Sequence, residues 1–67
     1  MLAVKKGQVW EIFDATVGYW DRAVVVAVEN DHVTLRHQTN FHKVMCLMGD
    51  LEQHPERFRF LAEARTH

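Results

Sequence analysis

The stretch RAVVVAVENDHVTLRHQ, residues 22–38, decides the fold of this chain. Its first half is rich in valine, a β-branched residue that is typical of strands. Residues 29–31 predict a tight turn, because asparagine and aspartate tolerate left-handed backbone. After the turn, apolar and polar residues alternate, so that Val33, Leu35 and His37 share one face of a second strand. The stretch therefore predicts an antiparallel β-hairpin.

Weaker signals on both sides of the hairpin predict further short elements. Residues 8–13 are β-rich, and residues 14–21 have the glycine and aspartates of a long loop. Residues 41–48 form a third apolar strand, with apolar side chains on both faces, so we expect it to be central or covered on its second side. Asp50 is placed to cap one helical turn over residues 51–54.

The C-terminal segment allows two interpretations. Phe58 and Leu61 have helical spacing, and the residues that follow have high helix propensity. Phe58, Phe60 and Ala62 instead alternate, as in a strand. We favour a short closing strand over residues 58–61, followed by a frayed end.

Composition and length indicate one ordinary folded domain over residues 1–67. The chain is 48% hydrophobic and 25% charged, close to the averages for globular proteins. A domain of this size buries only about 60% of the surface that its unfolded chain exposes, so self-association would help it. Eight basic and nine acidic residues give a net charge of −1, without the basic excess of a DNA-coating protein.

The sequence predicts a cytoplasmic protein. No apolar run approaches the roughly 18 residues of a membrane span, so we expect no membrane partner. The first residues lack the apolar region of a signal peptide. Cys46 is the only cysteine and cannot form an intrachain disulfide. The brevity of the chain suggests a phage or mobile-element origin.

These elements predict a mainly β domain, a small SH3-like antiparallel barrel of about five strands with one short helical turn before the last strand. Residues 6–10 (KGQVW), 23–28 (AVVVAV) and 33–35 (VTL) resemble the opening of a KOW or Tudor-type module. The resemblance covers residues 5–36, and the glycine that the KOW pattern places before its valine-rich strand is missing. It implies the fold and no particular activity, because this fold hosts many functions.

No residue pattern predicts catalysis or metal binding. His37, His42 and Cys46 are close in sequence, but a predicted turn separates the first from the other two. His42 and Cys46 would lie about 13 Å apart along one strand, at ~3.3 Å per residue. The glycines are scattered and form no phosphate-binding loop. We therefore expect no catalytic residue, no metal and no cofactor, and we interpret Cys46 as a small buried side chain.

The leading functional prediction is a non-catalytic binding or assembly module. Its predicted contact residues are Tyr19, Trp20, Arg22, Phe41 and His42. Tyr19 and Trp20 end the predicted long loop, and such loops often carry function. Their rings offer large contact areas with few rotatable bonds. In SH3-like folds the first long loop commonly frames the ligand groove, as the resemblance implies. The other interpretation is that Trp20 plugs the end of the barrel.

Two kinds of partner remain open. Apolar residues on both faces of 24–28 and 41–48 predict a protein partner or a homo-oligomer, most simply a dimer, unless the segment from residue 58 covers the second face. The alternative function is binding of RNA or single-stranded DNA through basic side chains and stacking aromatic rings. The basic candidates are Arg22, Arg36, Lys43, Arg57 and Arg59. Acidic residues interleave with them, so this alternative ranks second.

Overall fold

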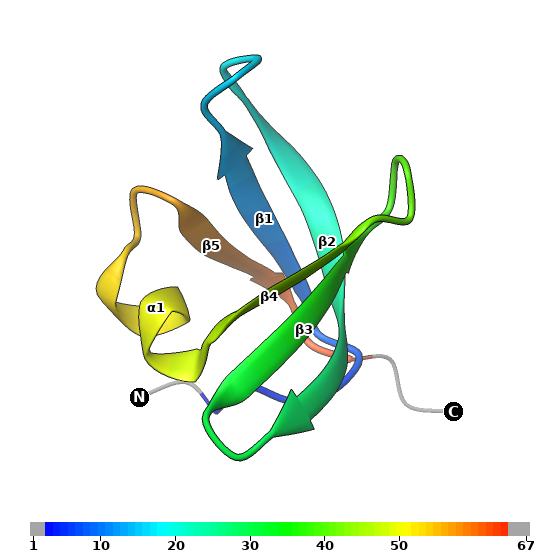
Figure 1. Cartoon of the computed structure of the whole chain (residues 1–67), viewed down its shortest axis with the longest axis vertical. Helices are drawn as coiled ribbons and strands as arrows, with labels where there is room; N and C mark the ends of the chain where they lie inside the picture. The colour runs from blue at the N-terminus through cyan, green and yellow to red at the C-terminus, as the bar shows by residue number, and fades with distance from the viewer. Residues whose placement is uncertain (1–2, 65–67) are drawn as a thin grey trace.

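The computed structural model describes residues 3–64, and its five strands form one antiparallel sheet (Figure 1). The order across the sheet is β4-β3-β2-β1-β5. The elements are β1 (Val9–Asp14), β2 (Tyr19–Glu29), β3 (His32–His37), β4 (Lys43–Leu47), α1 (Met48–Gln53) and β5 (Phe58–Ala62). The prediction of a mainly β fold with one short helix before the last strand is confirmed.

The sheet is not closed into a barrel, which corrects that part of the expectation. β4 and β5 are its two edges, and α1 lies between them and contacts both. Leu51 of α1 is buried, so the helix covers the open side of the core. The sheet bends at β2, which carries a β-bulge between Val25 and Ala27. The half with β3 and β4 therefore crosses in front of β1 and β5 (Figure 1).

The core lies between the bent sheet and α1. Val33 and Leu35 are fully buried, as the alternating pattern of β3 predicts. Trp10 of β1 is also buried, as expected. The closing strand is also confirmed, since Phe58 begins β5 and is buried. The buried apolar residues are Val4, Trp10, Ala23, Val25, Val33, Leu35, Leu51 and Phe58. The frayed end predicted after β5 extends to residues 65–67, outside the described residues.

Three predicted boundaries are wrong. β2 begins at Tyr19, so the predicted long loop 14–21 is a short turn in which Gly18 donates its N–H to the carbonyl of Asp14. α1 begins at Met48, and Asp50 lies in its first turn instead of capping it. β4 spans Lys43–Leu47 instead of residues 41–48, and it is an edge strand, so the central position, one of the two alternatives for this segment, is wrong. Because a strand sends neighbouring side chains to opposite faces, Tyr19 and Trp20 of β2 point to opposite sides of the sheet.

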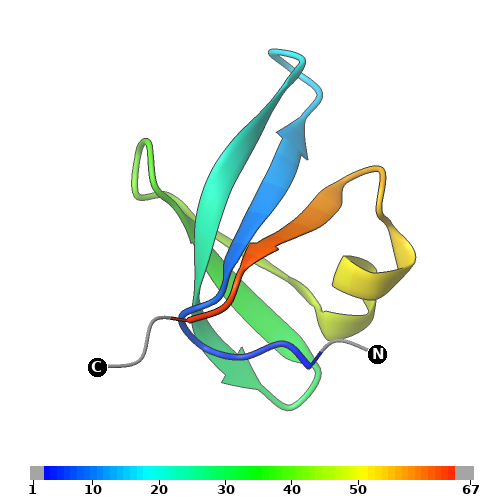
Figure 2. The same ribbon diagram turned by 180° about the vertical axis from the view of Figure 1, so that it is seen from behind.

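The one buried polar side chain in the described chain, Gln8, joins segments that are far apart in sequence. Its Oε1 accepts hydrogen bonds from the backbone N–H of Lys5 (3.1 Å) and from Trp10 Nε1 (3.2 Å). Its Nε2 donates to the carbonyl of Ala3 (2.9 Å) and to Glu63 (2.7 Å). Figure 2 shows how the segment before β1 passes the end of β5, where these bonds are made. Gln8 therefore fastens both ends of the described chain to the sheet.

Among residues 3–64, no helix has the length and apolar character needed to cross a membrane.

Candidate functional site

The five predicted contact residues lie on two different faces of the sheet. Tyr19 and His42 line a shallow pocket of about 530 Å³ on the side of the sheet that carries the core. Trp20 pairs with Phe13 of β1 on the opposite side, here called the outer face. Arg22 shares that face, because it lies two residues further along β2. The structure therefore does not bring the five residues together into one site.

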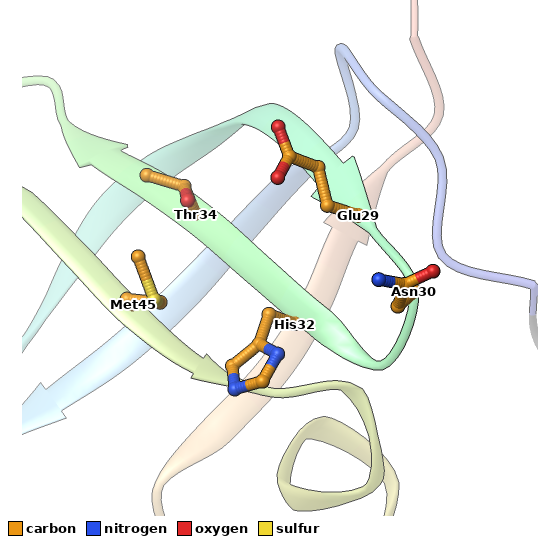
Figure 3. Close-up of a pocket in the computed structure, with 5 residues that line it drawn as sticks. All are labelled: Glu29, Asn30, His32, Thr34 and Met45. Carbon is orange, nitrogen blue, oxygen red and sulfur yellow. The ribbon is translucent and has the colours of Figure 1, made fainter.

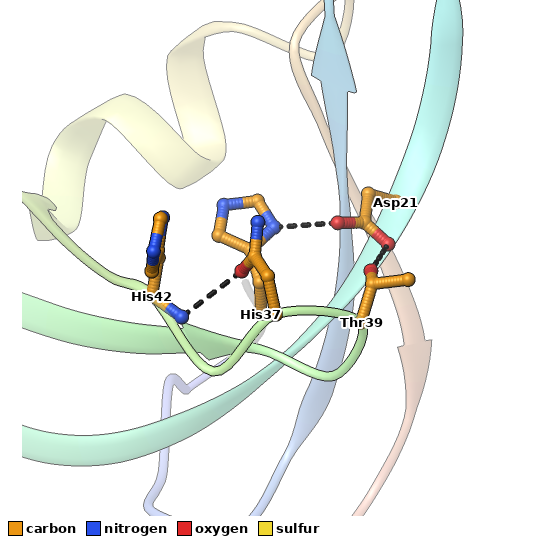
Figure 4. A network of polar contacts seen from close by, with 5 residues as sticks. Asp21, His37, Thr39 and His42 are labelled. Carbon is orange, nitrogen blue, oxygen red and sulfur yellow. Dashed lines mark hydrogen bonds and ion pairs between the residues drawn. The ribbon is translucent and has the colours of Figure 1, made fainter.

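The pocket contains a polar cluster of Asp21, His37 and Thr39 (Figure 4). Asp21 Oδ2 lies 2.8 Å from His37 Nδ1, and Thr39 Oγ1 donates to Asp21 Oδ1 over 2.6 Å. The His37 backbone N–H donates to the carbonyl of His42 (2.8 Å), which closes the β3–β4 loop. The pKa of Asp21 lies below its ordinary value, mainly because the Thr39 hydroxyl donates to its carboxylate. His37 also lowers this pKa, whereas burial acts in the opposite direction.

Sequence reasoning missed this cluster, because the turn alone does not give the observed register. The turn pairs Ala27 with Thr34, and the β-bulge between Val25 and Ala27 then shifts the register by one residue, so that Ala23 pairs with His37. Asp21 lies two residues before Ala23 and points to the same face, so its carboxylate reaches the imidazole. The additional contact with Thr39 depends on the loop conformation, which the sequence does not encode in any simple pattern.

Thr39 directs its hydroxyl hydrogen at one carboxylate oxygen of Asp21, and the other oxygen contacts His37. The three side chains therefore hold one another in a defined orientation. Within the described part of the chain, no group of three or more His, Cys, Asp or Glu side chains is placed to hold a metal ion.

Trp20 lies beneath an arginine on the outer face. The Arg59 guanidinium carbon is 3.8 Å from the centre of the Trp20 ring, and the ring edge contacts Phe13, with centroids 5.4 Å apart. Arg59 Nη2 also donates to Glu11 Oε1 over 3.0 Å. Trp20 is half-buried and does not belong to the core. Trp20 therefore does not fill the interior, and Arg59 covers one face of its ring.

Four of the five basic candidates share the outer face. Arg59 and Arg22 both pair with Glu11 across the sheet, and Arg36 pairs with Lys43. Arg57 precedes β5 and instead stacks over the ring of Phe58. The outer face thus carries more positive than negative charge along this part of the sheet, although the whole chain has a net charge of −1.

Phe41 is the most unusual of the predicted residues. It is 68% exposed, and its φ of 61° lies in the left-handed region, which is rare for a bulky side chain. Its ring faces the guanidinium of Arg36, with 5.8 Å between the guanidinium carbon and the ring centre. Strained backbone conformations cluster at functional sites, so Phe41 is a candidate contact residue.

Phe41 begins a row of exposed apolar residues along β4. Met45 is 69% exposed and Leu47 is 47% exposed, although both lie in a regular strand. We call Phe41, Met45 and Leu47 the β4 row. Met45 also lines a second shallow pocket with Thr34, His32, Glu29 and Asn30 (Figure 3). The apolar character of both faces of β4, visible in the sequence, is the signal that pointed to this surface.

Cys46 faces the core side of β4 and is half-buried. Burial is the main reason that the pKa of its thiol is raised, and the nearby Asp50 acts in the same direction. A raised pKa favours the unreactive thiol over the thiolate. The environment of Cys46 thus fits a packing role.

Comparisons with known protein families, curated proteins and solved structures found no significant match to this chain.

Proposed function

We propose that this chain is a non-catalytic module for protein binding or assembly, and that its contact surface is the β4 edge with the β4 row. The observation that carries the proposal is the exposure of Met45 and Leu47 on β4, and of Phe41 just before it, because β4 is an edge strand of the sheet that residues 3–64 form. An exposed apolar edge strand invites pairing with another chain, and natural proteins usually protect such edges.

The backbone of β4 supports the same surface. The carbonyl of His42 accepts from His37, and the N–H of Met48 donates to Asp31. These even-numbered residues turn their bonding groups toward β3, and strand geometry then turns those of Lys43, Met45 and Leu47 toward the open edge. An extended segment added at this edge would gain backbone hydrogen bonds together with apolar contacts.

The proposal retains only Phe41 of the predicted contact residues. Tyr19 and His42 lie in the pocket on the core side, and Trp20 and Arg22 lie further along the outer face. We also propose that the fold is an open variant of the SH3-like arrangement. The helical turn before β5 and the pairing of β5 with β1 support this interpretation.

Selection from a displayed library of extended peptides, followed by NMR titration, tests the surface. We expect selected peptides to shift the amide signals of Lys43, Met45 and Leu47, and Met45→Lys to weaken their binding about tenfold or more, a change of about 1.4 kcal/mol. Val17→Lys is the matched control, because Val17 is also an exposed apolar residue (56%) but lies in the β1–β2 turn. Peptides that bind Met45→Lys as tightly as the wild type would contradict the proposal.

Binding of single-stranded nucleic acid is the second candidate, favoured by the basic side chains on the outer face and the exposed Phe41 ring. Fluorescence titration with a mixed-sequence oligonucleotide at low and high salt tests it. We expect affinity to fall with salt, with a slope of about −0.7 per phosphate contact, and to fall again in the Arg22→Ala/Arg36→Ala variant. Affinity that is insensitive to salt, or unchanged in that variant, would rule this candidate out.

A further inference from the structure

We propose that the partner at the β4 edge is a second copy of this chain, and that the β4 strands of the two copies pair antiparallel about a two-fold axis at Met45. This inference rests on the proposed function, because it uses the same edge. It adds the identity of the partner, the register and the symmetry.

The backbone of β4 is complementary to itself. Lys43, Met45 and Leu47 direct their N–H and C=O groups toward the open edge, as the bonds of His42 and Met48 to β3 require. An antiparallel pair centred on Met45 sets Met45 opposite the partner's Met45 and Lys43 opposite the partner's Leu47. All of these are hydrogen-bonded pairs, each exchanging two N–H···O bonds. The free backbone N–H and C=O groups of the two β4 edges thus form hydrogen bonds with one another.

The same arrangement covers the exposed side chains of Met45 and Leu47. Met45 and Leu47 lie on the outer face and are among the most exposed apolar residues of the described chain. Pairing places the two Met45 side chains against each other at the axis. The aliphatic stem of Lys43 covers the partner's Leu47 and leaves its ammonium group in water. Lys43 is thereby compatible with the pairing and does not block the edge.

Charge complementarity selects a second copy in this orientation. One end of the outer face of β3 and β4 is basic, with Arg36 paired with Lys43. The other end is acidic, with Glu29 in the pocket beside Met45 and with the exposed Asp31 in the β2–β3 turn. A two-fold axis at Met45 brings the basic end of each copy to the acidic end of the other. Lys43 then lies about two strand spacings, ~10 Å, from the partner's Asp31, which its long side chain can approach.

Cysteine cross-linking in a Cys46→Ala background tests the register directly. Hydrogen-bonded antiparallel pairs have Cα atoms about 5.5 Å apart, within the range of a disulfide. We expect Met45→Cys to form a covalent dimer under mild oxidation. Lys43→Cys alone should not cross-link, whereas Lys43→Cys combined with Leu47→Cys should. Val17→Cys is the control for accidental collision, because Val17 is also well exposed (56%) but lies in the β1–β2 turn.

Sedimentation equilibrium at tens of micromolar tests the dimer without cross-linking. We expect twice the 7.9 kDa mass of the chain for the wild type and for Val17→Lys, and the monomer mass for Met45→Lys, which sets two positive charges against each other at the axis. Lys43→Glu should also weaken the dimer, and Lys43→Glu combined with Asp31→Lys should restore it. Circular dichroism checks that each variant is folded.

The possible failures are distinguishable. A wild type that stays monomeric, but whose β4 amides still shift with selected peptides, overturns the dimer and leaves the proposed function standing. A dimer that survives Met45→Lys, with no cross-link through Met45→Cys, overturns the β4 pairing. Peptide binding that also survives Met45→Lys overturns the proposed function itself.

Discussion

Gln8 Nε2 donates a hydrogen bond to Glu63 Oε1 over 2.7 Å, joining two residues that are 55 positions apart. Gln8 is fully buried, and its amide oxygen accepts from Lys5 and Trp10 at the same time. The side chain thus holds the segment before β1 against the segment after β5. In a domain with so thin a core, a fully bonded buried amide specifies the position of both ends.

Replacement of this amide should be costly. Gln8→Leu keeps a similar volume but leaves the buried indole N–H of Trp10 and the part-buried backbone N–H of Lys5 without their acceptor. We expect the free energy of unfolding to fall by about 2 kcal/mol, measured by urea denaturation. Gln38→Leu, at an exposed position, is the control and should change stability by less than about 0.5 kcal/mol. Equal stability of the two variants would show that the Gln8 bonds contribute little.

The same region makes Gly7 sensitive to any side chain. Gly7 has a φ of +94°, and a Cβ atom there would lie 2.8 Å from the Cβ of Ala64. Gly18 has a φ of +74° with open space around it, so Gly18→Ala adds only the backbone penalty, about 1 kcal/mol. We expect Gly7→Ala to be the more destabilising variant in thermal unfolding. Ala64→Gly should recover part of that loss, and a failure to do so would contradict the clash.

The sequence predicted the hairpin because its signals agree. A valine-rich strand, a turn of asparagine and aspartate, and a strictly alternating second strand leave Val33 and Leu35 only one buried arrangement. The buried face of β5 was predictable for the same reason, because Phe58 begins an alternating run. The position of Gln8 was not predictable, because its bonds depend on long-range folding and the residue is usually exposed.

The predicted contact residues do not form one site, because β2 begins at Tyr19 and not after residue 21. Tyr19 and Trp20 were assigned to a loop, where neighbouring side chains can point the same way. They are in β2, where alternation separates them, and Trp20 packs with Phe13 across the strands. Asp14 and Gly18 do form a turn, but the loop between the paired residues Asp14 and Tyr19 spans only residues 15–18. The β4 row was better signalled, because the apolar pattern on both faces of residues 41–48 already includes Phe41, Met45 and Leu47.

The stacking of Arg59 on Trp20 should be measurable as a coupling. Trp20→Ala should lower the free energy of unfolding by about 2 kcal/mol, less than the 3–5 kcal/mol of a core tryptophan, because the ring is half-buried. A double-mutant cycle with Arg59→Ala should give a coupling of about 0.5–1 kcal/mol. Arg22→Ala is the control, because Arg22 pairs with Glu11 but does not stack on the ring. An equal coupling for Arg22 would show that the effect is not stacking.

The contact of Asp21 with Thr39 and His37 predicts a pH-dependent part of the stability. The pKa of Asp21 is lowered from its ordinary value of 3.8, with the Thr39 hydroxyl as the main cause. The folded state therefore binds this proton less readily than the unfolded state. The stabilisation is fully present above the unfolded pKa and is lost as the pH falls through the folded pKa.

We therefore expect the difference in unfolding free energy between the wild type and Asp21→Asn to be constant at neutral pH and to shrink below about pH 4. Urea denaturation from about pH 7 to pH 2 measures it. The pKa of Glu56 is also lowered, but its effect is the same in both proteins. It therefore cancels when the unfolding free energy of the variant is subtracted from that of the wild type. Thr39→Val should reduce the pH dependence, because it removes the main donor to Asp21. A difference that stays constant down to pH 2 would show that the ionised Asp21 carboxylate does not stabilise the folded state.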